Sequence, residues 1–243
     1  MDKDQLKVLL VQFRHDEMMK SHEKEHVARS GKINLSQITV LDALTEKLED
    51  IFFEDADLVV LGGSGEYSIF ADLPCIEDLK KWLRKALDEN KPVLGSCLGA
   101  QFMAEFLGGK VVTEEARYEV GTFAVDLTVN AKKDPLFYDF PKSFRAQIGH
   151  HQTIIKVPEG AEILAQTAKA VHAFAWPGLS LYAMQFHPEL TKETMLERVD
   201  RCREAYAGES GAYEAIIETV EESPYTDYMI SQYIDRIVLP RYT

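Results

Sequence analysis

Gly95-Ser96-Cys97-Leu98-Gly99-Ala100-Gln101 directly follows the short apolar run at residues 92–94 and begins an apolar segment that ends near residue 107. Such a run closed by glycine is typical of a buried strand, and residues 98–107 have the pattern of a helix that ends at a glycine pair. A sharp turn between strand and helix can hold a side chain exposed above a sheet, and flanking glycines relieve its crowding. The segment therefore predicts an α/β fold with Cys97 at the end of a strand.

Cys97 is the candidate nucleophile. At a helix N-terminus the macrodipole and the free N–H groups favour a thiolate over a thiol. The alternative is a buried structural cysteine, which is a common state of a free thiol in proteins. The motif alone leaves both interpretations open.

The first half of the chain alternates strands and helices. Residues 6–13 and 56–61 are predicted as buried strands, and residues 74–90 carry Ile, Leu and Ala at helical spacing. This alternation predicts a three-layer α/β structure, in which helices flank a mixed, mostly parallel sheet.

In the second half, predicted strands lie close together, so part of the sheet is expected to be antiparallel. We expect residues 1–243 to form a single domain, with residues 191–243 as a C-terminal helical extension whose tail packs back onto the domain or against a partner. The predicted strands are residues 118–129, 144–148, 154–157, 171–176 and 181–186, and the predicted helices are residues 191–206 and 213–221.

Composition limits the classes of function. The 243 residues carry a net charge of −13 and show no basic cluster interleaved with aromatic residues, which argues against nucleic acid as a partner. The apolar runs are too short for a membrane span or a signal peptide. Three cysteines, Cys75, Cys97 and Cys202, are too few for a disulfide framework and fit a cytoplasmic protein. We interpret Cys75 and Cys202 as packing or surface residues.

His187-Pro188-Glu189 follows the strand predicted at residues 181–186 and is the candidate for a base with its partner. Cleavage of an amide by a thiolate needs a proton shuttle and an acid that orients the imidazole. Residues two apart on an extended segment point the same way, so His187 and Glu189 are expected to be neighbours. The alternative is an ordinary surface pair.

Two segments are candidates for binding an oxyanion. One is the N–H of Leu98, directly after the nucleophile, and the other is a backbone N–H of Gly62-Gly63-Ser64-Gly65, which follows a predicted parallel strand. The glycines also fit an ordinary turn. A phosphate loop is excluded because no Gly-Lys-Ser/Thr follows.

Three blocks, at residues 62–65, 95–101 and 184–189, resemble the class I glutamine amidotransferases, the triad-type glutaminase domains such as that of GMP synthase. They occur in the order and spacing of that family, and the resemblance extends from about residue 5 to about residue 195. Ser64 and Ala100 depart from the family, since many members have Pro at the first position and His or Met at the second.

The resemblance implies a flavodoxin-like architecture and hydrolysis of the glutamine side-chain amide through a γ-glutamyl thioester on Cys97, with neither metal nor cofactor. No synthetase sequence follows the glutaminase blocks, so the ammonia is expected to go to a separate synthetase subunit or to water. The implied site residues are Cys97, His187 and Glu189 for catalysis, Gly63 and Leu98 for the oxyanion, and Gly65, Gln101, His150 and Gln152 for the substrate.

Two other functions remain open. A γ-glutamyl hydrolase or peptidase would use the same thioester chemistry on small γ-glutamyl conjugates, with its specificity determined around Ala100 and residues 14–30. A regulatory binding module would keep the triad idle.

Residues 22–26, His-Glu-Lys-Glu-His, match the His-Glu-x-x-His pattern of zinc proteases. The surrounding segment is charged on nearly every face, and Arg29 stands where the extended pattern needs Gly. We therefore expect a solvated helix or lid close to the mouth of the active site.

Overall fold

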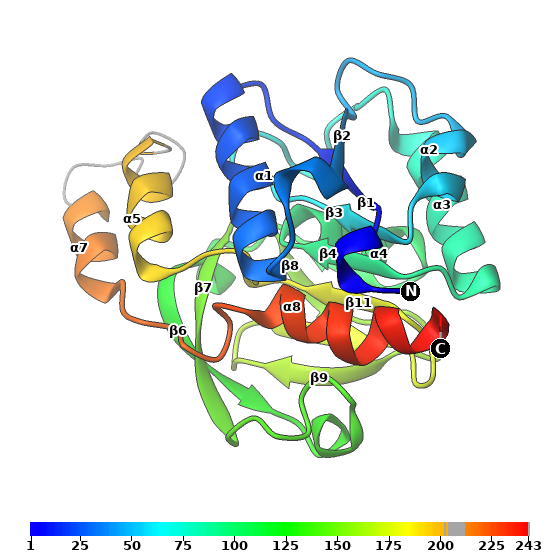
Figure 1. Cartoon of the computed structure of the whole chain (residues 1–243). Coiled ribbons are helices and arrows are strands. Elements are labelled where there is room, and N and C mark those ends of the chain that lie inside the picture. Colours follow the sequence, from blue (N-terminus) through cyan, green and yellow to red (C-terminus); the bar gives the residue numbers. More distant parts are fainter. Residues whose placement is uncertain (202, 204–211, 243) are drawn as a thin grey trace.

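The computed structural model describes residues 1–201, 203 and 212–242, so Cys202 and part of the helix predicted at 191–206 lie outside the described residues. A nine-stranded sheet runs through the molecule (Figure 1). Its strands in spatial order are β2 (Ile38–Asp42), β1 (Val8–Gln12), β3 (Leu58–Leu61), β4 (Val93–Ser96), β11 (Leu181–Met184), β10 (Val171–Ala175), β9 (Glu162–Gln166), β6 (Glu119–Leu127) and β7 (Ser143–His150).

The pairing of the strands changes once across this sheet, from parallel to antiparallel. Neighbouring strands are parallel from β2 to β11 and antiparallel from β11 to β7. The predicted mixed sheet is confirmed, although β2 and β9 were not among the predicted strands. Two further strands, β5 (Lys110–Val112) and β8 (Thr153–Lys156), form a separate antiparallel pair.

Helices cover both faces of the sheet (Figure 1). Strand β1 shows why: Leu9 and Val11 face one core, while Val8 and Leu10 face the other, as expected when side chains alternate along a strand. The first core contains residues of α3 and α4, and the second contains residues of α1 and α8. The helices are α1 (Glu17–Gly31), α2 (Asp50–Asp55), α3 (Ile76–Glu89), α4 (Leu98–Phe106), α5 (Lys192–Arg201), α7 (Ala212–Thr219) and α8 (Met229–Tyr233).

The end of the chain packs back onto the sheet, one of the two arrangements expected for it. Helix α8 continues as one π-helical stretch, Ile234–Val238, and Tyr233 and Ile234 are fully buried in the second core. The hydroxyl of Tyr233 donates a 2.6 Å hydrogen bond to the carbonyl oxygen of Ser180, which directly precedes β11. The tail is therefore anchored next to a central strand.

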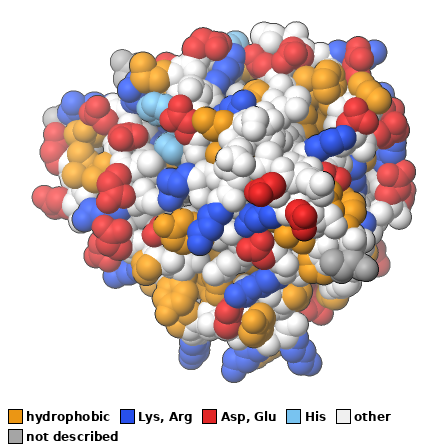
Figure 2. Space-filling model, in the orientation of Figure 1, with side chains coloured by type: hydrophobic (Ala, Val, Ile, Leu, Met, Phe, Trp, Pro, Cys, Tyr) orange, Lys and Arg blue, Asp and Glu red, His pale blue; other side chains and the backbone are white. Residues whose placement is uncertain are grey.

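Acidic and basic side chains are interspersed over the face seen in Figure 2. Among the helices of the described residues, none combines the length and the apolar character that crossing a membrane requires.

Helix α4 packs unusually close to β3, and this contact generates the first prediction. A Cβ on Gly99 would lie 2.2 Å from the carbonyl oxygen of Leu61, so Gly99→Ala must displace backbone. We expect Gly99→Ala to lower the free energy of unfolding by about 1–3 kcal/mol, the range for overpacking, as measured by urea denaturation.

Gly31→Ala is the matched control. Its Cβ would meet only side-chain atoms, the nearest being Cγ1 of Ile33 at 3.3 Å. We expect a change below about 1 kcal/mol, since flexible side chains can adjust. Equal effects of the two substitutions would contradict the close packing of α4 on β3.

Candidate active site

The residues that follow four neighbouring parallel strands lie at the same edge of the sheet. Strands β1, β3, β4 and β11 are adjacent in that order, and Arg14, Gly63, Cys97 and His187 follow their carboxyl ends. Ligands of open α/β sheets bind at this edge. The sheet order therefore brings together side chains that are far apart in the sequence.

Cys97 occupies a sharp turn between β4 and α4. Its φ of 48° and ψ of −101° are unfavourable for a residue with a side chain. Backbone hydrogen bonds hold the turn on both sides: the N–H of Cys97 donates to Met184 O at 2.8 Å, and the N–H of Gly99 donates to Gly62 O at 3.1 Å. The predicted turn is present, and these hydrogen bonds connect it to β11 and to the segment that follows β3.

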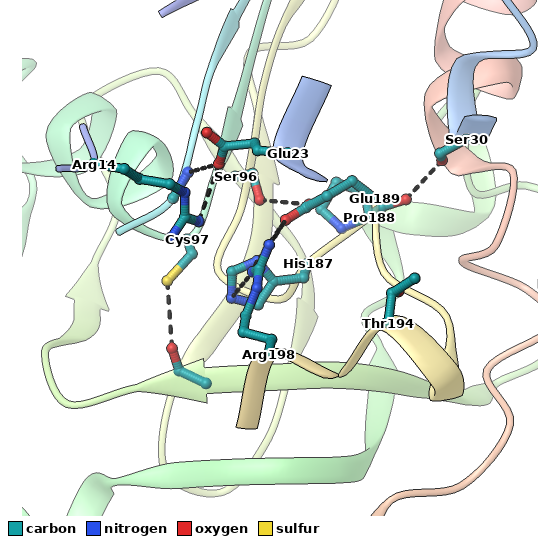
Figure 3. Close-up of polar contacts among 12 residues, drawn as sticks. Arg14, Glu23, Ser30, Ser96, Cys97, His187, Pro188, Glu189, Thr194 and Arg198 are labelled. Carbon is teal, nitrogen blue, oxygen red and sulfur yellow. Dashed lines mark hydrogen bonds and ion pairs between the residues drawn. The ribbon is translucent and has the colours of Figure 1, made fainter. Parts of the chain in front are cut away.

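His187 and Glu189 point toward each other, and Ser96 holds the carboxylate from β4 (Figure 3). His187 Nδ1 lies 2.8 Å from Glu189 Oε1, and Ser96 Oγ donates to Glu189 Oε2 at 2.9 Å. Burial acts to raise the pKa of Glu189, but the contacts with His187 and the positive charge of Arg198 together outweigh it and hold that pKa far below its usual range. The carboxylate is thus ionised and orients the imidazole.

The side chains of Cys97 and His187 both lie next to Gly63. A Cβ placed on Gly63 would lie 3.1 Å from His187 Cε1 and 3.5 Å from Cys97 Cβ. The sulfur itself lies 3.5 Å from the carbonyl oxygen of Gly149, to which the thiol donates (Figure 3). The side chains of Cys97 and His187 therefore border the same small space.

Both groups are neutral in this arrangement. Burial raises the pKa of the Cys97 thiol to about 12, although the positive charge of Arg198 opposes the rise. Burial also lowers the pKa of His187, and the favourable contact with Glu189 does not cancel that effect. The resting pair is a thiol next to a neutral imidazole.

Arg198 on α5 was not identified from the sequence. It is 3% exposed, its Nη1 lies 2.8 Å from His187 Nδ1, and it forms a 3.3 Å ion pair with Glu189. The neighbouring buried residues Met195 and Val199 show that this face of α5 points inward. Met195 and Val199 lie on the same helix face as Arg198, and this helical spacing of apolar residues could have indicated that Arg198 is buried.

Helix α1 also reaches the site, and here the expectation of a solvated helix was wrong for Glu23. This residue is 1% exposed and forms a 3.1 Å ion pair with Arg14 (Figure 3). The same carboxylate oxygen accepts the N–H of Gly63 at 3.1 Å, and the other accepts Gln12 Nε2 at 3.1 Å. The glutamate of the His-Glu-x-x-His match, Glu23, therefore pairs with Arg14 and accepts a hydrogen bond from Gly63. The Gly63 N–H, which was predicted to bind the oxyanion, donates to Glu23 in this structure.

A pocket of about 210 Å³ opens at Cys97. Gln101 Nε2 donates to the carbonyl oxygen of Gln152 at 2.8 Å, so two predicted substrate residues touch each other. Glu66 and Tyr67 also line the pocket and were missed, because their segment has no distinctive motif. The predicted residues around the pocket are Gly65, Cys97, Leu98, Gln101, His150 and Gln152.

Glu119, His150 and His172 form a buried cluster beside the pocket. One possible metal-ligand atom of each residue lies within 4.8 Å of the other two, and among the described residues this is the one such set of three. His172 Nε2 donates to Glu119 Oε2 at 3.0 Å. Burial acts to raise the pKa of Glu119, but the neighbouring imidazoles of His150 and His172 outweigh it and lower that pKa to about 2. The ionised carboxylate lies 3.4 Å from Nε2 of His150, which lines the pocket.

Comparison with known proteins gives a consistent picture. The family model "Glutamine amidotransferase class-I" matches residues 15–199. A subunit of the glutamine-hydrolysing GMP synthase of Methanocaldococcus jannaschii is 37% identical over 118 residues, which are 48% of this chain and 61% of that protein. The corresponding GMP synthase subunit of Picrophilus torridus is 34% identical over 137 residues, 56% of this chain and 69% of that protein.

Other relatives are longer than the matched region. The GMP synthase of Syntrophomonas wolfei is 43% identical over 104 residues, 42% of this chain but only 20% of that protein, so the chain spans a minor part of it. Among solved structures, a glutamine amidotransferase from Thermotoga maritima has a TM-score of 0.73 at 22% identity, covering 96% of this chain and 98% of that one. This last likeness concerns the fold.

The neutral resting state generates the second prediction. Because the pKa of Cys97 is raised to about 12, its thiolate fraction is small at neutral pH and grows about tenfold per pH unit. We expect its alkylation by iodoacetamide, followed by mass spectrometry of the Cys97 peptide, to accelerate from pH 7 to pH 10 without a plateau. A model thiol of ordinary pKa, about 8.5, levels off within that range and serves as control. A rate already constant at pH 7 would reveal a preformed thiolate instead.

Proposed function

We propose that this chain, which belongs to the class-I glutamine amidotransferase family, hydrolyses the side-chain amide of glutamine through a thioester on Cys97. The observation that carries the proposal is the convergence of Cys97 and His187 over Gly63, with His187 held by Glu189 at 2.8 Å. A nucleophile, a base and an orienting carboxylate are the parts that acyl transfer needs. Residues 1–243 act as one unit in this proposal, because α1 and α5 both contact the same triad.

In the proposed reaction, the thiol proton passes to His187 Nε2 as the sulfur forms a bond with the amide carbon. The carbonyl π electrons move to the oxygen, and the N–H of Leu98 at the start of α4 is one donor to that oxyanion. Collapse of this intermediate breaks the C–N bond, and His187 returns the proton to the leaving ammonia. Water then attacks the thioester with His187 as base, which gives glutamate and restores the thiol.

The size of the pocket favours free glutamine over larger γ-glutamyl conjugates. About 210 Å³ is below the range of roughly 300–1,000 Å³ typical of pockets for drug-sized ligands. Gly65, Gln101, His150 and Gln152 are the proposed substrate contacts. A γ-glutamyl hydrolase stays the second candidate, since the thioester chemistry is identical.

A separate synthetase subunit is the proposed receiver of the ammonia. Two of the relatives are named as one subunit of GMP synthase, a name that implies a second subunit in those proteins. The free thiols of Cys75 and Cys97 suit a reducing compartment, and we propose that the protein acts in the cytoplasm.

The third prediction tests the nucleophile. Cys97→Ala removes the attacking sulfur, so we expect ammonia release from glutamine to fall by at least about 10³-fold, because binding and the oxyanion site alone supply little turnover. Cys75→Ala is the matched control: this second buried free thiol lies at the start of α3, and its loss should leave kcat unchanged. Unaltered turnover in Cys97→Ala would refute the proposed chemistry. In a separate measurement on the wild-type protein, faster cleavage of γ-glutamyl anilide than of glutamine would favour a γ-glutamyl hydrolase.

The fourth prediction concerns the partner. Coupled assays should show that an ATP-dependent GMP synthetase subunit from the same source raises kcat for glutamine hydrolysis by about tenfold, which corresponds to about 1.4 kcal/mol of barrier lowering. Cys97→Ala mixed with that subunit is the control for contaminating activity. Identical glutaminase rates with and without the synthetase would contradict this partnership.

A further inference from the structure

The guanidinium of Arg198 lies against the face of the His187 ring. Its Nη1 is 2.8 Å from His187 Nδ1 and 3.4 Å from His187 Nε2. The two ring nitrogens point in nearly opposite directions, so a donor in the ring plane on the axis of one nitrogen would be far from the other. Similar distances to both nitrogens therefore place Nη1 above the ring, and arginine commonly stacks on flat side chains in this way. Figure 3 shows the side chain of Arg198 next to the ring of His187.

This placement leaves the in-plane proton of Nδ1 to Glu189. His187 Nδ1 lies 2.8 Å from Glu189 Oε1, and the same oxygen pairs with Arg198 at 3.3 Å. When the Nδ1 proton is donated to the carboxylate, the free lone pair of the ring is on Nε2, the atom proposed as the base. Arg198 therefore holds the face of the ring, while Glu189 holds its edge.

Charge balance gives Arg198 a second role. Arg198, His187 and Glu189 are at most 3% exposed, so solvent screens their charges weakly. With Arg198 present, the charges of the three side chains sum to zero when the imidazole is neutral. Without Arg198, they would sum to zero only when the imidazole is protonated. Because a net charge is costly in a buried site, Arg198 favours the unprotonated ring.

The other charged and titratable groups near His187 do not supply the same effect. Burial is the largest cause that lowers the pKa of His187, and the charges of Arg198 and then of Arg14 act in the same direction, while Glu189 opposes them. The charge of Arg14 is balanced by Glu23 in a 3.1 Å ion pair. Further groups near the ring among the described residues are Cys97 after β4, His150 at the end of β7, and His26 and Arg29 on α1.

Three of these further groups are neutral at physiological pH. Burial raises the pKa of the Cys97 thiol to about 12 and lowers the pKa of His26 and of His150 to about 4. Arg29 reaches the backbone of Glu189, whose carbonyl oxygen accepts its Nη2 at 2.7 Å. The cation that lies directly against the ring is therefore Arg198.

We propose that Arg198 is a positioning residue that holds the face of His187 and keeps this ring free of a proton until Cys97 delivers one. The proposal rests on the proposed hydrolysis of glutamine. In that reaction Nε2 takes the thiol proton as the C–S bond forms, and it gives the proton to the nitrogen of the leaving ammonia as the C–N bond breaks. A cation next to the imidazolium makes it a stronger acid, which favours the second transfer.

The opposing view makes Arg198 a structural counter-ion of Glu189. In that view its loss weakens the packing of α5, and the pH at which His187 titrates stays unchanged. The contacts favour the first view, because Arg198 is closer to His187, at 2.8 Å, than to Glu189, at 3.3 Å. Its buried Nε also has no hydrogen-bond partner among the described residues, whereas a buried structural arginine is expected to be more fully hydrogen-bonded.

The test uses the full-length protein and follows His187 directly. In protein with isotope-labelled histidine, an NMR pH titration gives the pKa of each ring, and the signal missing from His187→Gln identifies this residue. Arg198→Gln removes the charge and leaves Glu189 bonded to His187 and Ser96. Arg198→Lys keeps the charge on a flexible chain. Arg201→Gln, at an exposed position of the same helix, is the matched control for a lost positive charge.

We expect the pKa of His187 to rise by about one pH unit or more in Arg198→Gln, as for the loss of a neighbouring like charge. The acidic limb of kcat/KM for glutamine should move to higher pH by the same amount, which lowers activity in that limb about tenfold per unit. Arg198→Lys should restore most of the wild-type profile, and Arg201→Gln should titrate as the wild type does.

The two measurements separate this inference from the proposed function. An active wild-type protein whose His187 pKa is unchanged in Arg198→Gln would overturn the role of Arg198 alone. A wild-type protein that does not hydrolyse glutamine would overturn the proposed function, whatever the titration shows. Arg198→Met is the second neutral variant, with the same expected rise, and failure of both neutral variants to fold in urea titrations would establish the structural view.

Discussion

The left-handed backbone of Cys97 is the constraint on which the site depends. Such a conformation costs about 1–3 kcal/mol and persists only where its surroundings hold it. Here the N–H of Cys97 bonds to β11 and the N–H of Gly99 bonds to the segment after β3. The same two bonds hold Cys97 between β11, which precedes His187, and the segment that contains Gly63, so the strained turn is fixed beside both residues.

The parts of the site that the sequence could predict are those made by one short segment. The turn at Cys97 lies within a strand–turn–helix unit, and His187 with Glu189 lies on one extended stretch, so local spacing describes both. Glu23 is different, because its burial depends on Arg14 from another element, and α1 itself shows a charged, weakly amphipathic pattern. The strands β2 and β9 were missed for a related reason: their pairing partners, rather than a strong alternation, define them.

The charges around the thiol balance in two buried pairs. Arg14 pairs with Glu23 on the side of β1, and Arg198 pairs with Glu189 on the side of α5. Each pair is neutral as a whole, which limits the cost of burying four charges. Between them, Cys97 and His187 stay uncharged at rest, and in the proposed reaction charge would develop on the sulfur, the imidazole and the substrate oxygen only during attack. In that proposal the preorganised pairs would stabilise charges that the ground state does not carry, which is how binding groups accelerate a chemical step.

Helix α1 connects the two sides of this arrangement. Glu23 bonds to Gly63 and Arg14 on the side of the oxyanion, while Ser30 Oγ donates to Pro188 O at 2.8 Å and Arg29 Nη2 to Glu189 O at 2.7 Å on the side of the base. The backbone of the His-Pro-Glu segment and the donors near the nucleophile are thus tied to one rigid rod. A rotation of α1 would change both distances at once, because a helix transmits displacement along its length without bending. The charged segment that local patterns describe as solvent-facing is therefore the element that contacts both the His-Pro-Glu segment and Gly63.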